Sequence, residues 1–111
     1  MRILLDTHIL LWFLNDSTEL SPETISLLKE ADEVYASTVN IWEIVVKYSI
    51  GKLKIEFQVS KLLEIINESG LKILNIKPEH VLKLPDLENF HKVSFTSFNF
   101  PGISEFNWVA G

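Results

Sequence analysis

The sequence predicts an α/β sandwich in which helices cover a parallel sheet. Three short apolar segments have the length and composition of buried strands, at residues 3–5, 34–36 and 71–76. Segments with apolar residues at helical spacing lie between them, and this alternation is typical of a parallel sheet with helical crossovers. The chain has 111 residues, of which 47% are hydrophobic, so we expect one compact domain and no general disorder.

The first strand ends at Asp6, and a short helix is expected over residues 9–14. After a loop, Ser21 should cap the next helix, because proline follows at the first helical position. The apolar face of this second helix is expected to consist of Ile25, Leu27 and Leu28.

After the second strand, Ser37 or Thr38 should cap a helix that runs to about Ile50 and stops at Gly51. The residues of this helix that should face the core by their spacing are Val39, Trp42, Val45 and Val46. Two further aromatic residues are interpreted as core rather than base-stacking residues, because their neighbours are aliphatic: Trp12 and Tyr48.

A further helix is expected around residues 62–66, closed by Ser69 and Gly70, and the strand at residues 71–76 follows it. Pro78 opens a last helix that Pro85 interrupts. The inward residues expected for this helix are Val81, Leu82 and Leu84, and His80 is expected on its surface.

Composition excludes several kinds of site. The chain has no cysteine, which excludes disulfides, thiolate zinc sites and a cysteine nucleophile. Its formal net charge is −5, whereas proteins that bind nucleic acid by neutralising phosphates are usually basic. Binding of nucleic acid would therefore require a bound cation or local lysines, and Lys47, Lys52 and Lys54 cluster around one candidate site.

The apolar N-terminal run is interrupted by Asp6 and His8, and residues 9–14 are too few to span a bilayer. We therefore expect a soluble, cytoplasmic protein.

Asp6 is the first candidate for chemistry. Ligands of open parallel sheets bind at the carboxyl ends of the strands, where this acid is poised to bind a divalent cation. A plain helix cap is about equally compatible with its position. His8 follows and is expected either to orient Asp6 or to pack against Trp12.

Glu43 is the second candidate, because it interrupts an otherwise apolar helical stretch. Asn40 and Lys47 lie one turn before and after it, so an acid, an amide and a cation share one stripe. Such a stripe suits a site for metal and phosphate. It also suits a solvated surface with a Glu43–Lys47 pair worth about 0.2–0.5 kcal/mol.

Residues 4–12 read Leu-Leu-Asp-Thr-His-Ile-Leu-Leu-Trp and resemble the opening of PIN domains of the VapC toxin type. Residues 37–53 resemble the second signature of that family, and the likeness extends over residues 1–92, the expected PIN-like part of an α/β/α sandwich. The resemblance implies an endoribonuclease that depends on Mg²⁺ or Mn²⁺, is usually dimeric and is inhibited by a cognate antitoxin.

By position in this resemblance, Asp6 and Glu43 are the first two catalytic and metal-binding acids. Ser37 or Asn40 would support them, together with Lys47 from the same stripe.

The chain departs from the family after His91. The family has an Asp-Pro-Phe-Asp motif there, but this chain reads Lys-Val-Ser-Phe-Thr, and Glu105 is the sole later acid. Residues 93–111 form an atypical aromatic tail with no helical face and no clear strand, in place of a helix and a last strand. The sequence therefore predicts an impaired ribonuclease. The alternatives are a vestigial toxin that only binds its antitoxin, and a degraded reading frame that barely folds.

A shifted reading frame is our hypothesis for the origin of this tail. With suitable codons, residues 96–102 advanced by one base would read Arg-Leu-Leu-Ile-Ser-Gln-Ala, which resembles the helix that follows the family motif. Sequencing the coding DNA tests this directly, and a shifted frame without such a reading would refute it.

Overall fold

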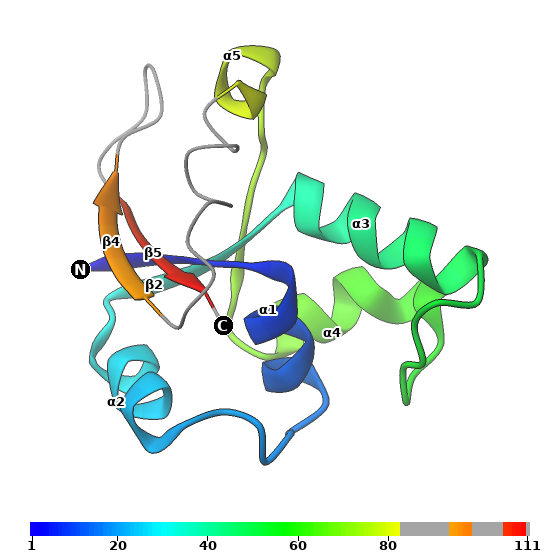
Figure 1. The fold of residues 1–111 in the computed structure, drawn as a ribbon, viewed down its shortest axis with the longest axis horizontal. Coiled ribbons are helices and arrows are strands. Elements are labelled where there is room, and N and C mark those ends of the chain that lie inside the picture. The colour runs from blue at the N-terminus through cyan, green and yellow to red at the C-terminus, as the bar shows by residue number, and fades with distance from the viewer. Residues whose placement is uncertain (83–93, 99–105, 111) are drawn as a thin grey trace.

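The computed structural model describes residues 1–82, 94–98 and 106–110. Within this part of the chain, the strands form one sheet in the order β3-β2-β1-β5-β4 (Figure 1). The strands are β1 (Arg2–Leu5), β2 (Glu33–Ser37), β3 (Lys72–Leu74), β4 (Ser94–Phe98) and β5 (Phe106–Ala110). Strands β1, β2, β3 and β5 are parallel, and β4 runs antiparallel to β5.

Strand β1 is the centre of the sheet. Ile3 is the register partner of Val34 on one side and of Asn107 on the other. Ile3, Leu4 and Leu5 are all buried, as in a parallel strand whose two faces are both covered. Ile3 and Leu5 begin the core cluster, which continues through α1, α3 and α4 with Ile9, Leu10, Ile44, Leu62 and Ile66.

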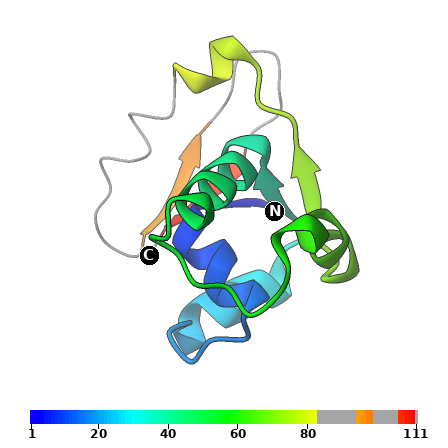
Figure 2. The same cartoon turned by 90° about the vertical axis from the view of Figure 1, so that its right-hand side faces the viewer.

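The helices of the described part are α1 (Thr7–Leu14), α2 (Pro22–Glu30), α3 (Thr38–Ser49), the 3₁₀ turn η1 (Val59–Lys61), α4 (Leu62–Glu68) and α5 (Pro78–Val81). β1 leads directly into α1 and β2 directly into α3, so both helices begin at the carboxyl edge of the sheet (Figures 1 and 2). The mixed α/β fold with a parallel sheet is therefore confirmed. Among the described residues, no helix combines the length and the apolar composition needed to cross a bilayer.

Local signals placed the starts of α2 and α3 correctly, whereas α1 begins at Thr7, two residues before the expected start. The hydroxyl of Ser21 accepts a hydrogen bond from the amide of Thr24 at 3.1 Å, with Pro22 in the first turn. Ser37, rather than Thr38, caps α3 and forms a reciprocal capping box with Asn40.

The prediction for the inward face of α3 was wrong for three of its four residues, and Val39 alone is partly buried. Trp42 is 68% exposed, and Val45, Val46 and Tyr48 are exposed as well. The buried residues of α3 are instead Asn40 and Ile44, which lie one turn apart. Aliphatic residues occupy both faces of this helix, so apolar spacing alone could not identify the buried one. The interpretation of Trp12 as a core residue is supported, since it packs partly buried against the core.

The region of α5 also differs from the prediction. His80 is buried rather than on the surface, and its Nδ1 accepts a hydrogen bond from the amide of Lys77 at 3.0 Å, which satisfies that ring nitrogen. Leu82, predicted to point inward, is 81% exposed and lies just beyond the end of α5. The predictions for the side chains of Val81 and Leu84 lie outside the residues that the structure describes.

The tail contributes two strands that the sequence did not predict. β4 and β5 pair with each other, and β5 pairs with β1. The expectation that the tail lacks strands was therefore wrong for residues 94–98 and 106–110. His91 and Glu105 lie outside the described residues, and the boundary at residue 92 stays a prediction.

Candidate active site

Asp6 lies at the carboxyl end of β1 and caps α1. Its Oδ1 accepts a hydrogen bond from the amide of Ile9 at 2.8 Å, and its side chain is partly buried. The helix-cap role is therefore present. A carboxylate offers about four acceptor positions, so capping one amide does not exclude a cation ligand at the same residue.

Glu43 projects from the middle of α3 and is held by partners on both oxygens. Its Oε2 accepts a hydrogen bond from the hydroxyl of Thr7 at 3.2 Å, and its Oε1 pairs with Nζ of Lys47 at 2.8 Å. The Glu43 side chain is 30% exposed, so it remains accessible to solvent. Thr7 follows Asp6 directly in the chain. The Thr7–Glu43 hydrogen bond therefore places Glu43 against the neighbour of Asp6.

Asn40 is fixed by the cap of α3. Its Oδ1 accepts hydrogen bonds from the amide of Ser37 at 2.8 Å and from its hydroxyl at 3.0 Å. This fixes the orientation of the amide, whose Nδ2 donates to Oγ1 of Thr7 at 2.9 Å. Asn40 is only 5% exposed, so its donor needs this partner.

These contacts form a series of hydrogen bonds that runs from the start of α3 through Thr7 to Glu43. A threonine hydroxyl has one proton, and Thr7 uses its oxygen to accept from Asn40. Its proton is then available for Glu43, which is the direction observed. Ser37, Asn40, Glu43 and Lys47, all singled out from the sequence, thus belong to one hydrogen-bonded network.

Thr7 is a site residue that was not predicted from the sequence. This residue is 8% exposed and links α1 to α3 at the edge where β1 and β2 end. Its position directly after Asp6 was the available signal, because a polar residue at the end of a buried strand lies at the ligand-binding edge of a parallel sheet.

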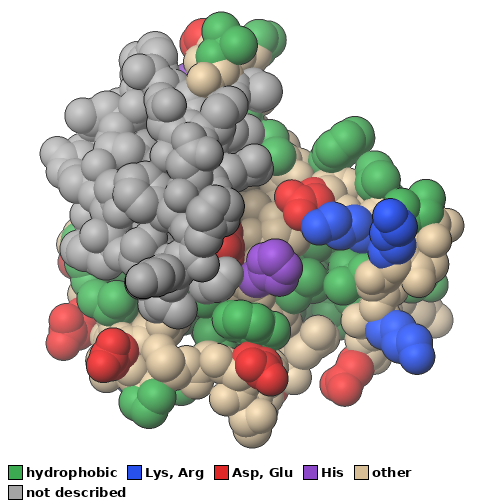
Figure 3. All heavy atoms as spheres, in the orientation of Figure 1, with side chains coloured by type: hydrophobic (Ala, Val, Ile, Leu, Met, Phe, Trp, Pro, Cys, Tyr) green, Lys and Arg blue, Asp and Glu red, His purple; other side chains and the backbone are tan. Residues whose placement is uncertain are grey.

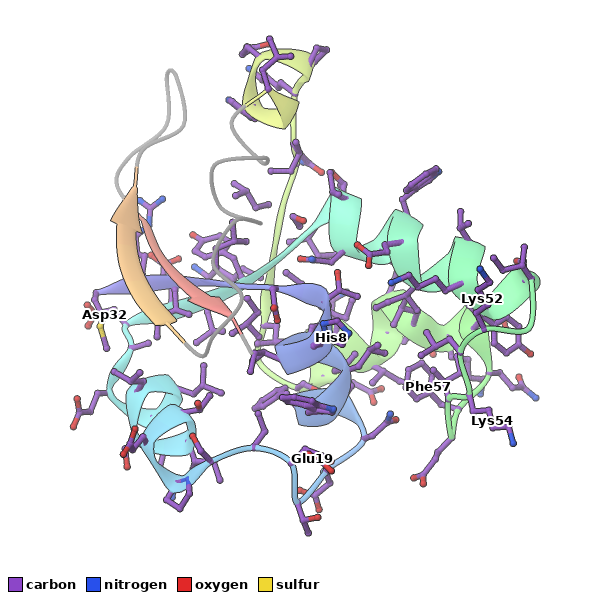
Figure 4. The ribbon with its side chains drawn as sticks, viewed as in Figure 1. His8, Glu19, Asp32, Lys52, Lys54 and Phe57 are labelled. Carbon is purple, nitrogen blue, oxygen red and sulfur yellow. The ribbon has the colours of Figure 1, made fainter. Side chains whose placement is uncertain are left out.

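His8 lies on the exposed side of α1 (Figure 4). Its ring centroid is 6.2 Å from that of Trp12, with a tilt of 43° between the ring planes. Of the two roles expected for His8, packing against Trp12 is the one observed.

Comparison with known proteins gives the family. A family model described as PIN domain matches residues 3–96, a range that includes both Asp6 and Glu43. The chain belongs to the PIN domain family. PIN domains are generally nucleases that use divalent metal ions. No curated protein and no solved structure matches the chain.

The donor set of this PIN domain agrees in part with a divalent cation. Asp6 and Glu43 supply carboxylate oxygens, the ligand type that Mg²⁺ and Mn²⁺ prefer. Among the described residues, no three Asp, Glu or His side chains gather closely enough to form a metal cluster. A cation here would therefore depend on two carboxylates, with water or substrate oxygens completing its coordination.

Proposed function

We propose that this PIN domain is a metal-dependent endoribonuclease of the VapC toxin type whose activity is lowered by an incomplete acidic site. The observation that carries the proposal is the hydrogen bond from Thr7 to Glu43, which joins α3 to the end of β1 where Asp6 lies. An acid at the end of β1 and a second acid bonded to the next residue, both at the carboxyl edge of a parallel sheet, are a reasonable cation site.

In this proposal Asp6 and Glu43 bind one Mg²⁺ or Mn²⁺ ion and act as the catalytic acids. A divalent cation there would polarise an attacking water and offset negative charge on the scissile phosphate. Thr7 and Lys47 hold the two oxygens of Glu43, which limits its rotamers before any ligand arrives. Ser37 and Asn40 act one step further away by orienting Thr7.

The lowered activity follows from the missing motif. The chain has Glu105 as its sole acid after His91, where the resemblance leads one to expect two aspartates. Fewer carboxylates provide less negative charge, and Mg²⁺ tolerates poorly defined sites badly. We expect a weak cation affinity and correspondingly slow cleavage.

An exposed apolar surface on α3 favours binding of a protein partner, which is the basis of a second candidate function. Trp42, Val45 and Val46 form an exposed apolar stripe on α3. Contiguous exposed apolar residues are typical of interaction sites. We propose that the chain forms a homodimer and binds a cognate antitoxin in the cytoplasm. The alternative function is that of a catalytically inactive toxin that retains only this binding.

Cleavage of a mixed RNA pool by the purified, folded chain tests the nuclease proposal. Activity with Mg²⁺ or Mn²⁺ should disappear on adding a chelator and in Asp6→Asn. Asp16→Asn, a matched change at an exposed acid in the loop after α1, should retain it. A folded wild-type chain that cleaves nothing would favour the inactive toxin. Cleavage that survives in Asp6→Asn would contradict the assignment of Asp6.

A further inference from the structure

Three lysines lie beyond Glu43, in the last turns of α3 and in the segment that follows it. Lys47 lies one turn after Glu43 on α3, about 6 Å further along the helix axis. Lys52 and Lys54 follow in the segment beyond α3 (Figure 4). In Figure 3, lysine and arginine side chains gather over this end of α3, beside an acidic side chain and a histidine.

The end of α3 brings Lys52 back to Lys47. The amide of Lys52 donates to the carbonyl of Lys47 at 2.9 Å, and the amide of Gly51 donates to the carbonyl of Tyr48 at 3.1 Å. This pair of hydrogen bonds is the Schellman motif, which requires a left-handed residue that glycine supplies here with a φ of +75°. The turn therefore fixes the backbone of Lys52 beside that of Lys47.

Lys52 and Lys54 form no ion pair within the described part of the chain. Both side chains are exposed. Lys47, by contrast, pairs with Glu43. Because the whole chain has a net charge of −5, two exposed cations in one short segment, both without an ion pair among the described residues, provide a local attraction for anions.

We propose that Lys52 and Lys54 bind the phosphates of single-stranded RNA on one side of the cleavage point, with Lys47 between them and the acids. This inference rests on the proposed function for its substrate. A single strand carries one phosphate charge per nucleotide, so it presents a regular row of negative charges along its length. A strand whose scissile phosphate lies at Asp6 and Glu43 would then lay its next phosphates along α3 towards its C-terminal end.

The alternative is that these lysines only complement the carbonyls at the C-terminal end of α3. Cations there stabilise a helix by about 0.3–1 kcal/mol. The two roles differ in what they change: a structural role affects the unfolding temperature, whereas phosphate contacts affect RNA affinity and its dependence on salt.

The test is binding of a labelled, unstructured single-stranded RNA, measured by fluorescence anisotropy in chelator over a range of salt concentrations. Each phosphate contact on a single strand changes the slope of log K against log salt by about 0.7. Lys52→Gln and Lys54→Gln should each reduce the slope by that amount, and affinity near 0.1 M salt about fivefold. The double variant should lose about 25-fold. Lys29→Gln, the same change at an exposed lysine of α2, should leave both quantities unchanged.

The outcomes separate this inference from the nuclease proposal. Wild-type slopes in Lys52→Gln and Lys54→Gln would overturn the inference, even if the chain cleaves RNA. Weaker binding of an acidic peptide by these variants with unchanged RNA binding would overturn it in favour of a protein partner. RNA binding that depends on both lysines in a chain that cleaves nothing would uphold the inference and reject only the nuclease proposal.

Discussion

The hydroxyl of Thr7 donates to Oε2 of Glu43 at 3.2 Å while accepting from Nδ2 of Asn40 at 2.9 Å. This single side chain connects the end of β1 with the middle of α3. The cap of α3 orients Asn40, Asn40 orients the hydroxyl of Thr7, and this hydroxyl restricts the rotamers of the flexible Glu43 side chain. Two candidate site residues far apart in the sequence are thereby held in one arrangement.

Replacing Thr7 by valine should destabilise the fold. Valine has nearly the same shape but cannot accept from Asn40, whose buried donor would then lack a partner, at a penalty of about 1–3 kcal/mol. Chemical denaturation measures the change in unfolding free energy. Thr7→Ser keeps the hydroxyl and should recover most of the loss. Equal losses in Thr7→Val and Thr7→Ser would mean that the methyl group, not the hydrogen bonds, matters at this position.

Replacing Lys47 by methionine should have opposite effects on stability and cation binding. The Lys47–Glu43 pair is partly exposed, so its loss should reduce stability by no more than about 0.5 kcal/mol. Removing a cation 2.8 Å from Oε1 of Glu43 frees the carboxylate and should tighten Mn²⁺ binding. Calorimetric titration of Lys47→Met with Mn²⁺ measures this. Weaker binding in the variant would show that the hold of Lys47 on the rotamer of Glu43 outweighs its competition for Oε1.

Acid stability should depend on Glu33 at the opposite edge of the sheet. Hydrogen bonds from Lys72 and then Tyr35 lower the pKa of Glu33 below its ordinary value of 4.5. A carboxyl group whose pKa is lower in the folded state stabilises the fold above its unfolded pKa. That contribution is lost as the pH falls through the lower folded value.

Wild-type stability should therefore decline from about pH 4.5 downward, and Glu33→Gln should decline less steeply over the same range. Denaturation midpoints at several pH values provide the comparison. Glu23→Gln, at an exposed acid of α2, should keep the wild-type slope. An unchanged slope in Glu33→Gln would refute the role of this cross-strand pair.

The apolar stripe on α3 should matter for association and not for folding. Trp42 is 68% exposed, so Trp42→Gln should change the unfolding free energy by no more than about 0.5 kcal/mol. If the stripe is the dimer surface, the variant should sediment as a monomer at concentrations where the wild type is dimeric. Leu63→Gln, at an exposed apolar residue of α4, is the control. A dimer that persists in Trp42→Gln would exclude this stripe.

The sequence predicted the fold class because its strands and helices alternate and because its caps are chemically distinct. Ser21 and Ser37 show this directly, since each accepts the expected hydrogen bond at the start of its helix. Asp6 was placed correctly at the end of β1 for a related reason: a charge that ends an apolar run marks the end of a buried strand. These signals are local, so they can be detected without knowing the tertiary contacts.

What the sequence missed depends on contacts between distant segments. The buried side of α3 is set by packing against α1, so Trp42 and Ile44 could not be distinguished by hydrophobicity. Thr7 gains its importance from Asn40, 33 positions later in the chain. The tail was judged by its own pattern, whereas the pairing of β5 with β1 brings together residues about 100 positions apart, such as Ile3 and Asn107.

Joint binding of one divalent cation by Asp6 and Glu43 is tested most directly by a Mn²⁺ titration of the folded chain by calorimetry. The wild type should bind one ion, and Asp6→Asn and Glu43→Gln should each weaken binding by about tenfold or more, as loss of a ligand or its immediate support does. Asp16→Asn should bind as the wild type does. Equal affinity in Asp6→Asn, Glu43→Gln and the wild type would contradict this joint binding, and any metal-dependent chemistry of this PIN domain would then lie elsewhere.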